Sequence, residues 1–579
     1  MQQRSSEDQS HDFARAGGVL PPNFLSLFPA GSEAGGIWQS LMQGHSADPS
    51  RLTALQNGFL QQHLALWTAM LAREHGQPGN AATAADKDDD GRDKRFAARD
   101  WRDSHYHDYL RRAYLLNARF LGELVESAEL DQAAKRRLRF YTRQLIDAMS
   151  PANFAATNPE ALRLALDTQG ESLHAGIRQL IEDVELGRVS MVDESAFDVG
   201  RNLAITPGEV VFENELIQLI QYKPVTAKVR KRPLLMVPPC INKFYILDLQ
   251  PENSFVRYAV GQGNTVFMVS WRNITEERLG GLTWDDYLAE GVLKSIEVAR
   301  AISRSEQINA LGFCVGGTLL AAALALLRAR GEDRVASVTL LATMLDFTDP
   351  GDIGVFIDEA SVAAREAAIG SGGILSGKEL AFVFSALRAN DLVWSYVVNN
   401  YLKGKTPDAF DILYWNADST NLPGPMYCWY VRNMYLENRL REPGRLTMCG
   451  LPIDLGAILL PTYILATRED HIVPWKTAYL STRHLKGDTR FVLGASGHVA
   501  GVINPPEKNR RSYWTSGRLC ASAEEWVAGA EEVRGSWWPN WNEWLRTFSG
   551  GERAAPKKLG NAKYKPIEAA PGRYVKVKV

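Results

Sequence analysis

The chain has 579 residues, of which 23% are charged, and its formal net charge is −2. It is therefore longer than one typical domain, and its balanced, interspersed charges give no indication of nucleic-acid binding. The five cysteines form no CxxC pair and no Cys/His cluster with metal-ligand spacing, which favours free thiols in a reducing cytoplasm. The polar stretch from Met1 to Asp8 carries no apolar signal-peptide core.

The first 200 residues predict helices joined by a linker. Residues 1–95 are interpreted as a variable segment with one amphipathic helix, Arg51 to Glu74, and a linker over residues 76–95, where small, polar and charged residues follow one another without an apolar period. Residues 96–200 predict a helical domain, because apolar side chains such as Leu116 and Phe120 recur at helical spacing.

Residues 201–579 are interpreted as one α/β domain in which strands and helices alternate. Apolar runs bounded by turn residues predict strands at 234–237, 265–270, 307–311, 336–341, 462–466 and 490–493. One intervening helix is expected to begin after Thr283, whose side chain can form a capping box with Asp286. This alternation indicates a mostly parallel sheet with helices on both faces.

One uncharged stretch, residues 308–327, is long enough to cross a bilayer. Asn309 and three glycines interrupt it, and a buried strand followed by a buried helix would have the same hydropathy. We therefore interpret the stretch as a strand and a helix and expect no membrane span.

A long insertion, at about residues 346–455, separates two of the predicted strands. It is dense in aromatic residues, including Trp394, Tyr430 and Tyr435, and predicts a mainly helical cap over the strand ends, where ligands of such sheets bind. The alternative is a helical subdomain with a core of its own.

The most informative motif is Gly312-Phe313-Cys314-Val315-Gly316-Gly317, which has the form of a hydrolase nucleophile elbow with cysteine in place of serine. A strand candidate precedes it and a strong helix former follows it, as the motif requires. Gly312 and Gly316 have no Cβ, so a strained turn and a close approach of helix and strand are sterically possible. We expect the sulfur of Cys314 to lie at the carboxyl end of a central strand.

A nucleophilic cysteine needs a base, and the base needs an orienting acid. In hydrolases of this fold the acid and then the histidine follow the nucleophile in the chain, each in a loop after a late strand. Asp470 and His498 have these positions. His471 is an alternative base, although it comes early in this order, and Cys240 is interpreted as a packing residue.

Acyl transfer is the chemistry that this arrangement predicts. An oxyanion hole would use the backbone N–H of Val315 and a second N–H near Cys240 or Ile241, since Pro238 and Pro239 have none. A cysteine acyl-enzyme is a thioester, so exchange with a coenzyme A thioester is nearly isoenergetic. The sequence contains no P-loop, dinucleotide fingerprint or zinc signature, and we expect no cofactor.

From about Phe96 to Val579 the chain closely resembles the class I polyhydroxyalkanoate synthases. The matching segments are residues 150–154, 237–243, 270–273, 312–317, 414–416, 468–475, 497–501 and 571–576. The resemblance does not extend to the first 95 residues. One departure lies in the insertion, where Ala389 follows Arg388 in place of the expected proline.

The resemblance implies an α/β-hydrolase fold with an inserted helical cap, preceded by a helical N-terminal domain. It places the catalytic triad on Cys314, Asp470 and His498, with (R)-3-hydroxyacyl-CoA, chiefly 3-hydroxybutyryl-CoA, as the substrate. It also implies a homodimer in the cytoplasm, attached to a growing polyester granule and to granule-coating proteins such as phasins.

Several alternatives stay open. An esterase, thioesterase or polyester depolymerase could use the same triad, and a non-catalytic granule scaffold could retain it. Asp470 could orient His498 or activate the attacking hydroxyl, and one or two thiols could carry the chain. The apolar faces of the N-terminal helices could contact the granule or pack within the protein.

Overall fold

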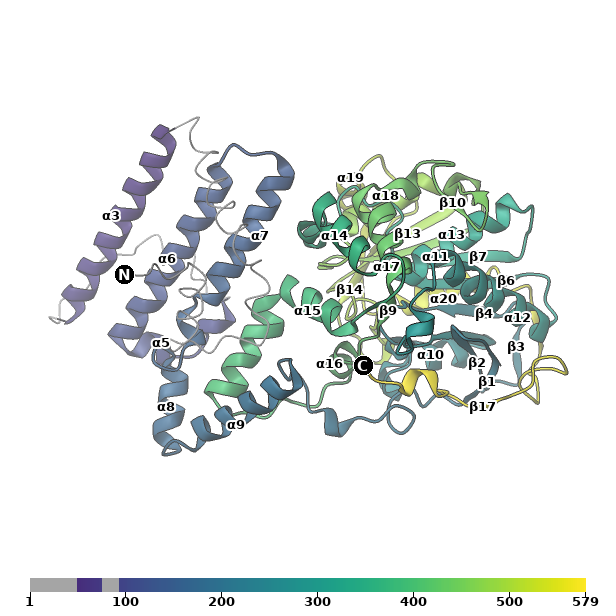
Figure 1. Cartoon of the computed structure of the whole chain (residues 1–579), viewed down its shortest axis with the longest axis horizontal. Helices are drawn as coiled ribbons and strands as arrows, with labels where there is room; N and C mark the ends of the chain where they lie inside the picture. The colour runs from purple at the N-terminus through teal and green to yellow at the C-terminus, as the bar shows by residue number, and fades with distance from the viewer. Residues whose placement is uncertain (1–48, 75–92) are drawn as a thin grey trace, which may run out of the picture. The chain divides into compact units, whose positions relative to one another are not determined.

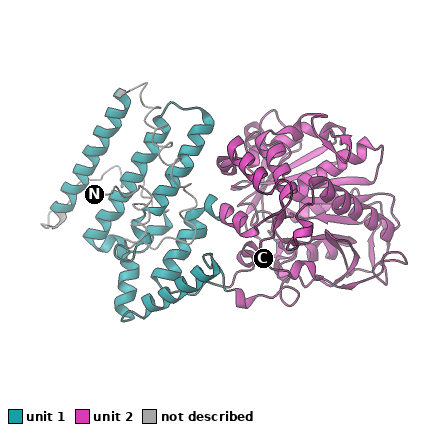
Figure 2. Ribbon diagram, viewed as in Figure 1, with its two compact units in different colours: residues 1–193, 385–408 teal, residues 194–384, 409–579 magenta. Residues whose placement is uncertain are grey.

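The computed structural model describes residues 49–74 and 93–579 (Figure 1). The chain divides into two compact units, residues 1–193 with 385–408 and residues 194–384 with 409–579 (Figure 2). The sequence-based boundary was at residues 200 and 201. Most of the proposed linker at 76–95 lies outside the described residues.

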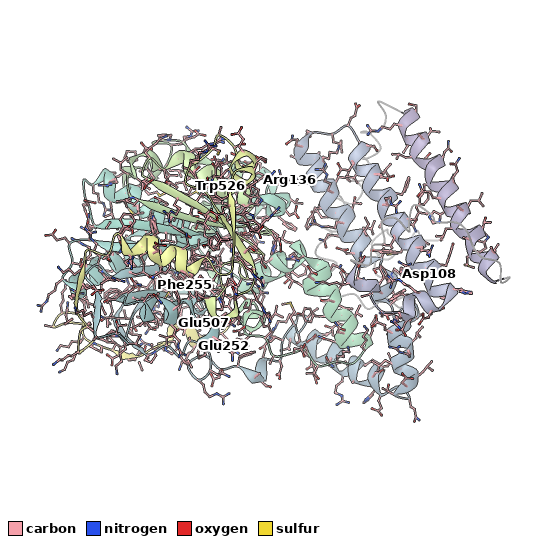
Figure 3. The ribbon with its side chains drawn as sticks, turned by 180° about the vertical axis from the view of Figure 1, so that it is seen from behind. Asp108, Arg136, Glu252, Phe255, Glu507 and Trp526 are labelled. Atoms are coloured by element: carbon pink, nitrogen blue, oxygen red, sulfur yellow. The ribbon has the colours of Figure 1, made fainter. Side chains whose placement is uncertain are left out.

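The described part of the first unit is helical. Its longest helices are α3 (Pro49–Glu74), α6 (His105–Ser127), α7 (Gln132–Ala148), α8 (Pro159–Asp167) and α9 (Glu171–Leu186). Figure 1 shows α3, α6 and α7 side by side. Phe59 of α3 stacks on Phe120 of α6 with ring centroids 4.3 Å apart. Asp108, labelled in Figure 3, forms a buried ion pair with Arg111 inside α6.

A segment of the predicted cap, residues 385–408, belongs to this first unit. The Tyr401 hydroxyl donates to Asp183 of α9 over 2.6 Å, and Lys403 pairs with Glu160 of α8 at 2.7 Å. Gly176 of α9 lies so close to Tyr401 that a Cβ would come within 2.0 Å of its carbonyl oxygen. Tyr401, an aromatic residue that the sequence analysis assigned to the cap, therefore packs against α9 within the first unit.

The second unit is built on a mixed sheet, which has 11 strands within the described residues, in the order β15-β14-β13-β12-β7-β6-β4-β5-β2-β1-β17. Its centre is parallel and confirms the strands expected from the sequence, which the structure gives as β4 (Leu234–Val237), β5 (Val266–Trp271), β6 (Ile308–Phe313), β7 (Val335–Leu341), β12 (Thr462–Thr467) and β13 (Thr489–Gly494).

Both edges of the sheet are antiparallel, which the sequence did not reveal. One edge contains β2 (Ile217–Tyr222), β1 (Gly208–Glu213) and β17 (Glu568–Ala569), and the other contains β14 (Ser512–Thr515) and β15 (Glu531–Arg534). The sheet is therefore parallel only in its middle.

Helices cover both faces of this sheet, as predicted. Val338 and Leu340 of β7 pack in the same core as α13 (Val315–Ala329), while Thr339 accepts a hydrogen bond from the Trp541 indole of α20 (Trp538–Arg546). Neighbouring residues of a strand point to opposite faces, so α13 and α20 lie on different sides. On the α20 side, Phe255 (labelled in Figure 3) packs against Trp541.

The uncharged stretch at 308–327 is divided between β6 and α13, which are both buried. Across residues 49–74 and 93–579, no helix combines the length and the apolar composition that a bilayer crossing requires.

The insertion between β7 and β12 is mainly helical, as expected. In the second unit it contains α14 (Glu359–Ile369), α16 (Asp411–Ala417), α17 (Gly424–Tyr430) and the π-helix η12 (Val431–Leu436), and α15 (Gly377–Leu387) runs across the boundary between the two units.

The predicted capping box at Thr283 is present. It begins a continuous helical segment that consists of α11 (Trp284–Asp286), the π-helix η8 (Tyr287–Leu293) and α12 (Lys294–Ser303). The Asp286 carboxylate accepts from the Thr283 N–H over 2.7 Å, and the Thr283 hydroxyl accepts from the Asp286 N–H over 3.3 Å.

We expect Thr283→Ala to destabilise the second unit by about 1 kcal/mol, because it leaves the first turn of this helix without its side-chain acceptor. In a calorimetric melt the unfolding midpoint should fall by about 2 °C. Thr283→Ser retains the hydroxyl and is the matched control. An alanine variant as stable as the serine variant would contradict this role of the cap.

Candidate active site

Cys314 occupies the turn between β6 and α13, as the elbow motif predicts. Its φ of 52° and ψ of −128° lie in a region that non-glycine residues rarely adopt. Its N–H donates to the Leu341 carbonyl oxygen of β7 over 2.9 Å, which fixes the turn to the neighbouring strand. The residue is only partly buried.

The glycines of the motif allow α13 to approach the strands. A Cβ on Gly312 would lie 2.4 Å from the Cα of Gly317, and one on Gly316 would lie 2.3 Å from the carbonyl oxygen of Val237. These distances are shorter than any real carbon contact, so any larger residue would displace the helix. The motif glycines are required by packing.

Asp470 lies in the loop after β12, and hydrogen bonds hold both of its carboxylate oxygens. One oxygen accepts from the backbone N–H groups of Ile472 and Val473 over 2.9 and 2.8 Å. The other accepts from the Thr467 hydroxyl over 3.1 Å and lies 2.8 Å from Nδ1 of His498. The carboxylate is therefore fixed in orientation toward this imidazole.

His498 lies in the loop after β13 and joins the other two residues. Its buried ring stacks on Phe313, the residue before Cys314, with centroids 5.4 Å apart, and its Nδ1 is hydrogen bonded to Asp470. Burial by itself lowers the pKa of His498. The negative charges of Asp470 and Cys314 and the hydrogen bond to Asp470 outweigh burial and raise this pKa from 6.5 to about 10.

The structure thus brings together the three residues that the sequence put forward, and it places the alternatives differently. Asp470 is hydrogen bonded to Nδ1 of His498, the base expected from the order of the loops. Cys240 is buried, and burial raises the pKa of its thiol, which disfavours a thiolate there. This environment suits the packing role inferred for Cys240.

The two expected oxyanion donors lie in adjoining segments. Val315 is the first residue of α13, where backbone N–H groups have no acceptor within the helix. Ile241 lies in the loop after β4, and the first residues of that loop contact the elbow, since Gly316 packs against the carbonyl oxygens of Val237 and Pro238.

Sequence reasoning did not single out Tyr430 and Tyr435 as site residues. Tyr430 is buried and Tyr435 is partly buried, their rings meet edge to face with centroids 5.5 Å apart, and the Phe347 ring contacts both. Burial raises the pKa of each phenol, and a negative charge on Cys314 adds to this effect. The sequence showed that the insertion is rich in aromatic residues, but it did not show that these two tyrosines lie close enough to Cys314 to interact with its charge.

The described residues do not meet the requirements of a metal site. In residues 49–74 and 93–579, no group of three or more His, Cys, Asp and Glu side chains could hold a metal ion.

Two protein-family models match the chain. One is described as the N-terminus of poly-beta-hydroxybutyrate polymerase (PhaC) and matches residues 92–259. The other is described as the alpha/beta hydrolase fold and matches residues 233–505.

Full-length relatives are also similar. The PhaC subunit of the poly(3-hydroxyalkanoate) polymerase of Cupriavidus necator is 56% identical over 542 residues, which cover 93% of this chain and 90% of that protein. The PhaC subunit of Rhizobium meliloti is 41% identical over 537 residues, which cover 92% of this chain and 87% of that protein.

The chain belongs to the poly(3-hydroxyalkanoate) polymerase family. It is an enzyme of the acyltransferase type with an α/β-hydrolase fold. Among solved structures, the monoacylglycerol lipase of Paleococcus ferrophilus superposes with a TM-score of 0.32 and 15% identity, covering 49% of this chain and 90% of the lipase.

Replacing Asp470 with asparagine is expected to lower the pKa of His498, because it removes the negative charge that stabilises the imidazolium. Asp470→Asn retains the shape of the side chain. The pKa would be measured by NMR titration of ¹³C-labelled histidine, with Asp488→Asn, at an exposed aspartate, as the control. An unchanged His498 pKa would contradict the assigned pairing.

The same pairing predicts a pH-dependent stability. A folded pKa of about 10 lies above the ordinary value of 6.5, so the stabilisation from the charged pair is complete below pH 6.5 and is lost as the pH rises through 10. The difference in melting temperature between wild type and Asp470→Asn should therefore be largest below pH 6.5 and shrink toward pH 10 in calorimetric melts. A difference that grows with pH would have the wrong sign.

Proposed function

We propose that the chain polymerises (R)-3-hydroxyacyl-CoA, chiefly 3-hydroxybutyryl-CoA, into a polyester and releases coenzyme A, with Cys314 as the covalent nucleophile. One observation carries this proposal: His498, hydrogen bonded to Asp470, stacks on Phe313 beside Cys314 at the carboxyl edge of the sheet, in a chain whose relatives are named poly(3-hydroxyalkanoate) polymerases.

In the first step His498 takes the proton of Cys314, and the thiolate attacks the thioester carbonyl carbon. The N–H of Val315 stabilises the oxyanion, together with a second N–H that we assign to Ile241. The C–S bond to coenzyme A breaks, and the leaving thiolate receives the proton from His498. The acyl group is then held on Cys314 as a thioester.

In the second step the 3-hydroxyl of another acyl unit attacks this thioester. The hydroxyl proton passes to His498, the new C–O bond forms an oxoester, and the C–S bond to Cys314 breaks, so that the sulfur recovers a proton from His498. Each cycle adds one unit and returns the enzyme to its starting state. We assign to the aromatic cluster of Tyr430, Tyr435 and Phe347 the role of keeping water from competing with the hydroxyl.

The competing functions differ in their products. An esterase, a thioesterase or a depolymerase would release free hydroxy acid, whereas a polymerase releases coenzyme A and accumulates high-mass polyester. A non-catalytic scaffold would release neither. The hydrogen bond from Asp470 to His498 and the stacking of this imidazole on Phe313, next to Cys314, favour a catalytic site over a relic one.

Cys314→Ala is expected to abolish coenzyme A release from (R)-3-hydroxybutyryl-CoA, because the proposed reaction has no other nucleophile to form the acyl-enzyme. Cys314→Ser should lower turnover by orders of magnitude, since a hydroxyl is a much weaker nucleophile at its ordinary pKa. Thiol release and polymer mass would be followed together. Near-normal release by the alanine variant, or free hydroxy acid as the wild-type product, would exclude the proposed reaction.

We also propose that the enzyme acts as a homodimer at the surface of a polyester granule and that α3 contributes to this attachment. One face of α3 carries Leu60, Leu64, Trp67 and Leu71, which are spaced along a single helical stripe and exposed, Leu60 by 62% and Leu64 by 67%. The neighbouring face packs on α6 through Phe59, and Trp67, at the edge of the stripe, contacts Tyr109 of α6. An apolar stripe with a tryptophan is suited to an interface between water and an apolar phase.

Leu64→Ser combined with Trp67→Ser should reduce the fraction of protein that sediments with amorphous poly(3-hydroxybutyrate) granules, while coenzyme A release stays at the wild-type rate. Gln61→Ser with Ala65→Ser, on the same helix, is the matched control. Equal sedimentation of the two variants would contradict attachment through α3, and sedimentation velocity would show whether the dimer is affected instead.

A further inference from the structure

The loop after β4, residues 238–243, is held at both ends through its carbonyl groups. The indole N–H of Trp271 donates to the Pro238 carbonyl oxygen over 2.9 Å. The indole N–H of Trp415, in α16, donates to the Lys243 carbonyl oxygen over 2.7 Å. This is the loop that contains the expected oxyanion donor, so its backbone direction bears on the chemistry.

The middle of the loop is held by one buried side chain, Thr420. Its hydroxyl lies 2.8 Å from the Cys240 carbonyl oxygen and 2.7 Å from the Ile241 carbonyl oxygen, and its backbone N–H also donates to the Ile241 carbonyl over 3.3 Å. A hydroxyl has only one proton to donate. Because the Ile241 carbonyl already accepts from the N–H, the Cys240 carbonyl is the one that depends on the Thr420 hydroxyl.

The Cys240 carbonyl and the Ile241 N–H belong to the same peptide group. A trans peptide is planar, and its C=O and N–H bonds point in opposite directions. A hydroxyl that holds the carbonyl oxygen on one side therefore sets the direction of the N–H on the other side.

We propose that Thr420 is a positioning residue for the oxyanion hole: its hydroxyl orients the Cys240–Ile241 peptide so that the Ile241 N–H is fixed before the substrate arrives. This inference rests on the proposed acyl transfer at Cys314. It gives the insertion a part in catalysis, since Thr420 comes from the segment that follows α16.

The surroundings of Thr420 would keep the loop folded without its hydroxyl. Asn242 and Ser419 form an antiparallel backbone bridge. Next to it, the buried ammonium of Lys243 lies 2.6 Å from the carboxylate of Asp418. These contacts do not involve the Thr420 side chain, so removing its hydroxyl should free one peptide group and leave the rest of the loop in place.

The test compares Thr420→Val, which has nearly the same shape but no hydroxyl, with Thr420→Ser, which retains the hydroxyl. For (R)-3-hydroxybutyryl-CoA we expect the valine variant to have a kcat lower by about 10- to 100-fold, with KM within about twofold of wild type, since complete loss of an oxyanion donor costs about 10²–10³ in kcat. The serine variant should retain most of the activity.

Alkylation of Cys314 by iodoacetamide is the second measurement. This displacement forms no oxyanion, so its rate reports the thiol and His498 but not the Ile241 N–H. We expect the valine variant to be alkylated at the wild-type rate while its acyl transfer is slow. Equal losses in both reactions would indicate a general structural defect and overturn the positioning role.

Valine and serine variants with equal kcat would also overturn this inference, because the hydroxyl would then be dispensable. The same experiment separates failure of the proposed function from failure of the role of Thr420. A wild-type chain that releases no coenzyme A contradicts the proposed function and the inference with it. A wild-type chain that turns over, together with a fully active valine variant, contradicts the role of Thr420 alone.

Discussion

The site depends on the backbone conformation of one residue, Cys314. A non-glycine residue at positive φ costs about 1–3 kcal/mol and persists only where its surroundings fix it. Here the surroundings are the contacts of Gly312 with Gly317 and of Gly316 with Val237, which leave no room for a Cβ. Tight packing of α13 against the sheet therefore maintains the strain, and the strain holds the sulfur at the end of β6.

The register of the parallel strands brings Asp470 and His498 to the same edge of the sheet as Cys314. The strands β6, β7, β12 and β13 are neighbours in the sheet, and their last residues are in register, with Phe313 paired to Leu341 and Thr467 paired to Gly494. The Ala342 N–H donates to the Leu465 carbonyl oxygen over 2.7 Å and extends the pairing beyond β7. The loops that carry Asp470 and His498 consequently begin at one edge, close to the elbow.

The sequence predicted the parallel centre of the sheet, and it put forward the three candidate site residues, because both follow from local signals: buried apolar runs, a glycine-rich turn and the order of loops. It did not predict the antiparallel edges. In β2 the buried Gln218 interrupts the apolar pattern, and its amide is satisfied by Glu213 and by Glu568, which is far away in the sequence. The polar strand β15 gives no apolar signal at all.

The same limit applies to the insertion. Tyr401 was assigned to the cap, yet its hydroxyl donates to Asp183 in the first unit. Thr420 belongs to no recognisable motif, because its hydrogen-bond partners are backbone carbonyls of a loop 180 residues earlier in the chain. Backbone acceptors have no residue signature, so contacts of this kind cannot be inferred from side-chain types.

The structure also bears on the question that the sequence left open about Asp470. An ionised carboxylate has about four lone-pair positions. In Asp470 one oxygen accepts from Ile472 and Val473, and the other accepts from Thr467 and faces His498. A carboxylate that activated the substrate hydroxyl would need a free acceptor position directed at it. Since donors surround both oxygens, the arrangement favours an Asp470 that orients His498 and stabilises its imidazolium, with the hydroxyl proton passing to His498 itself.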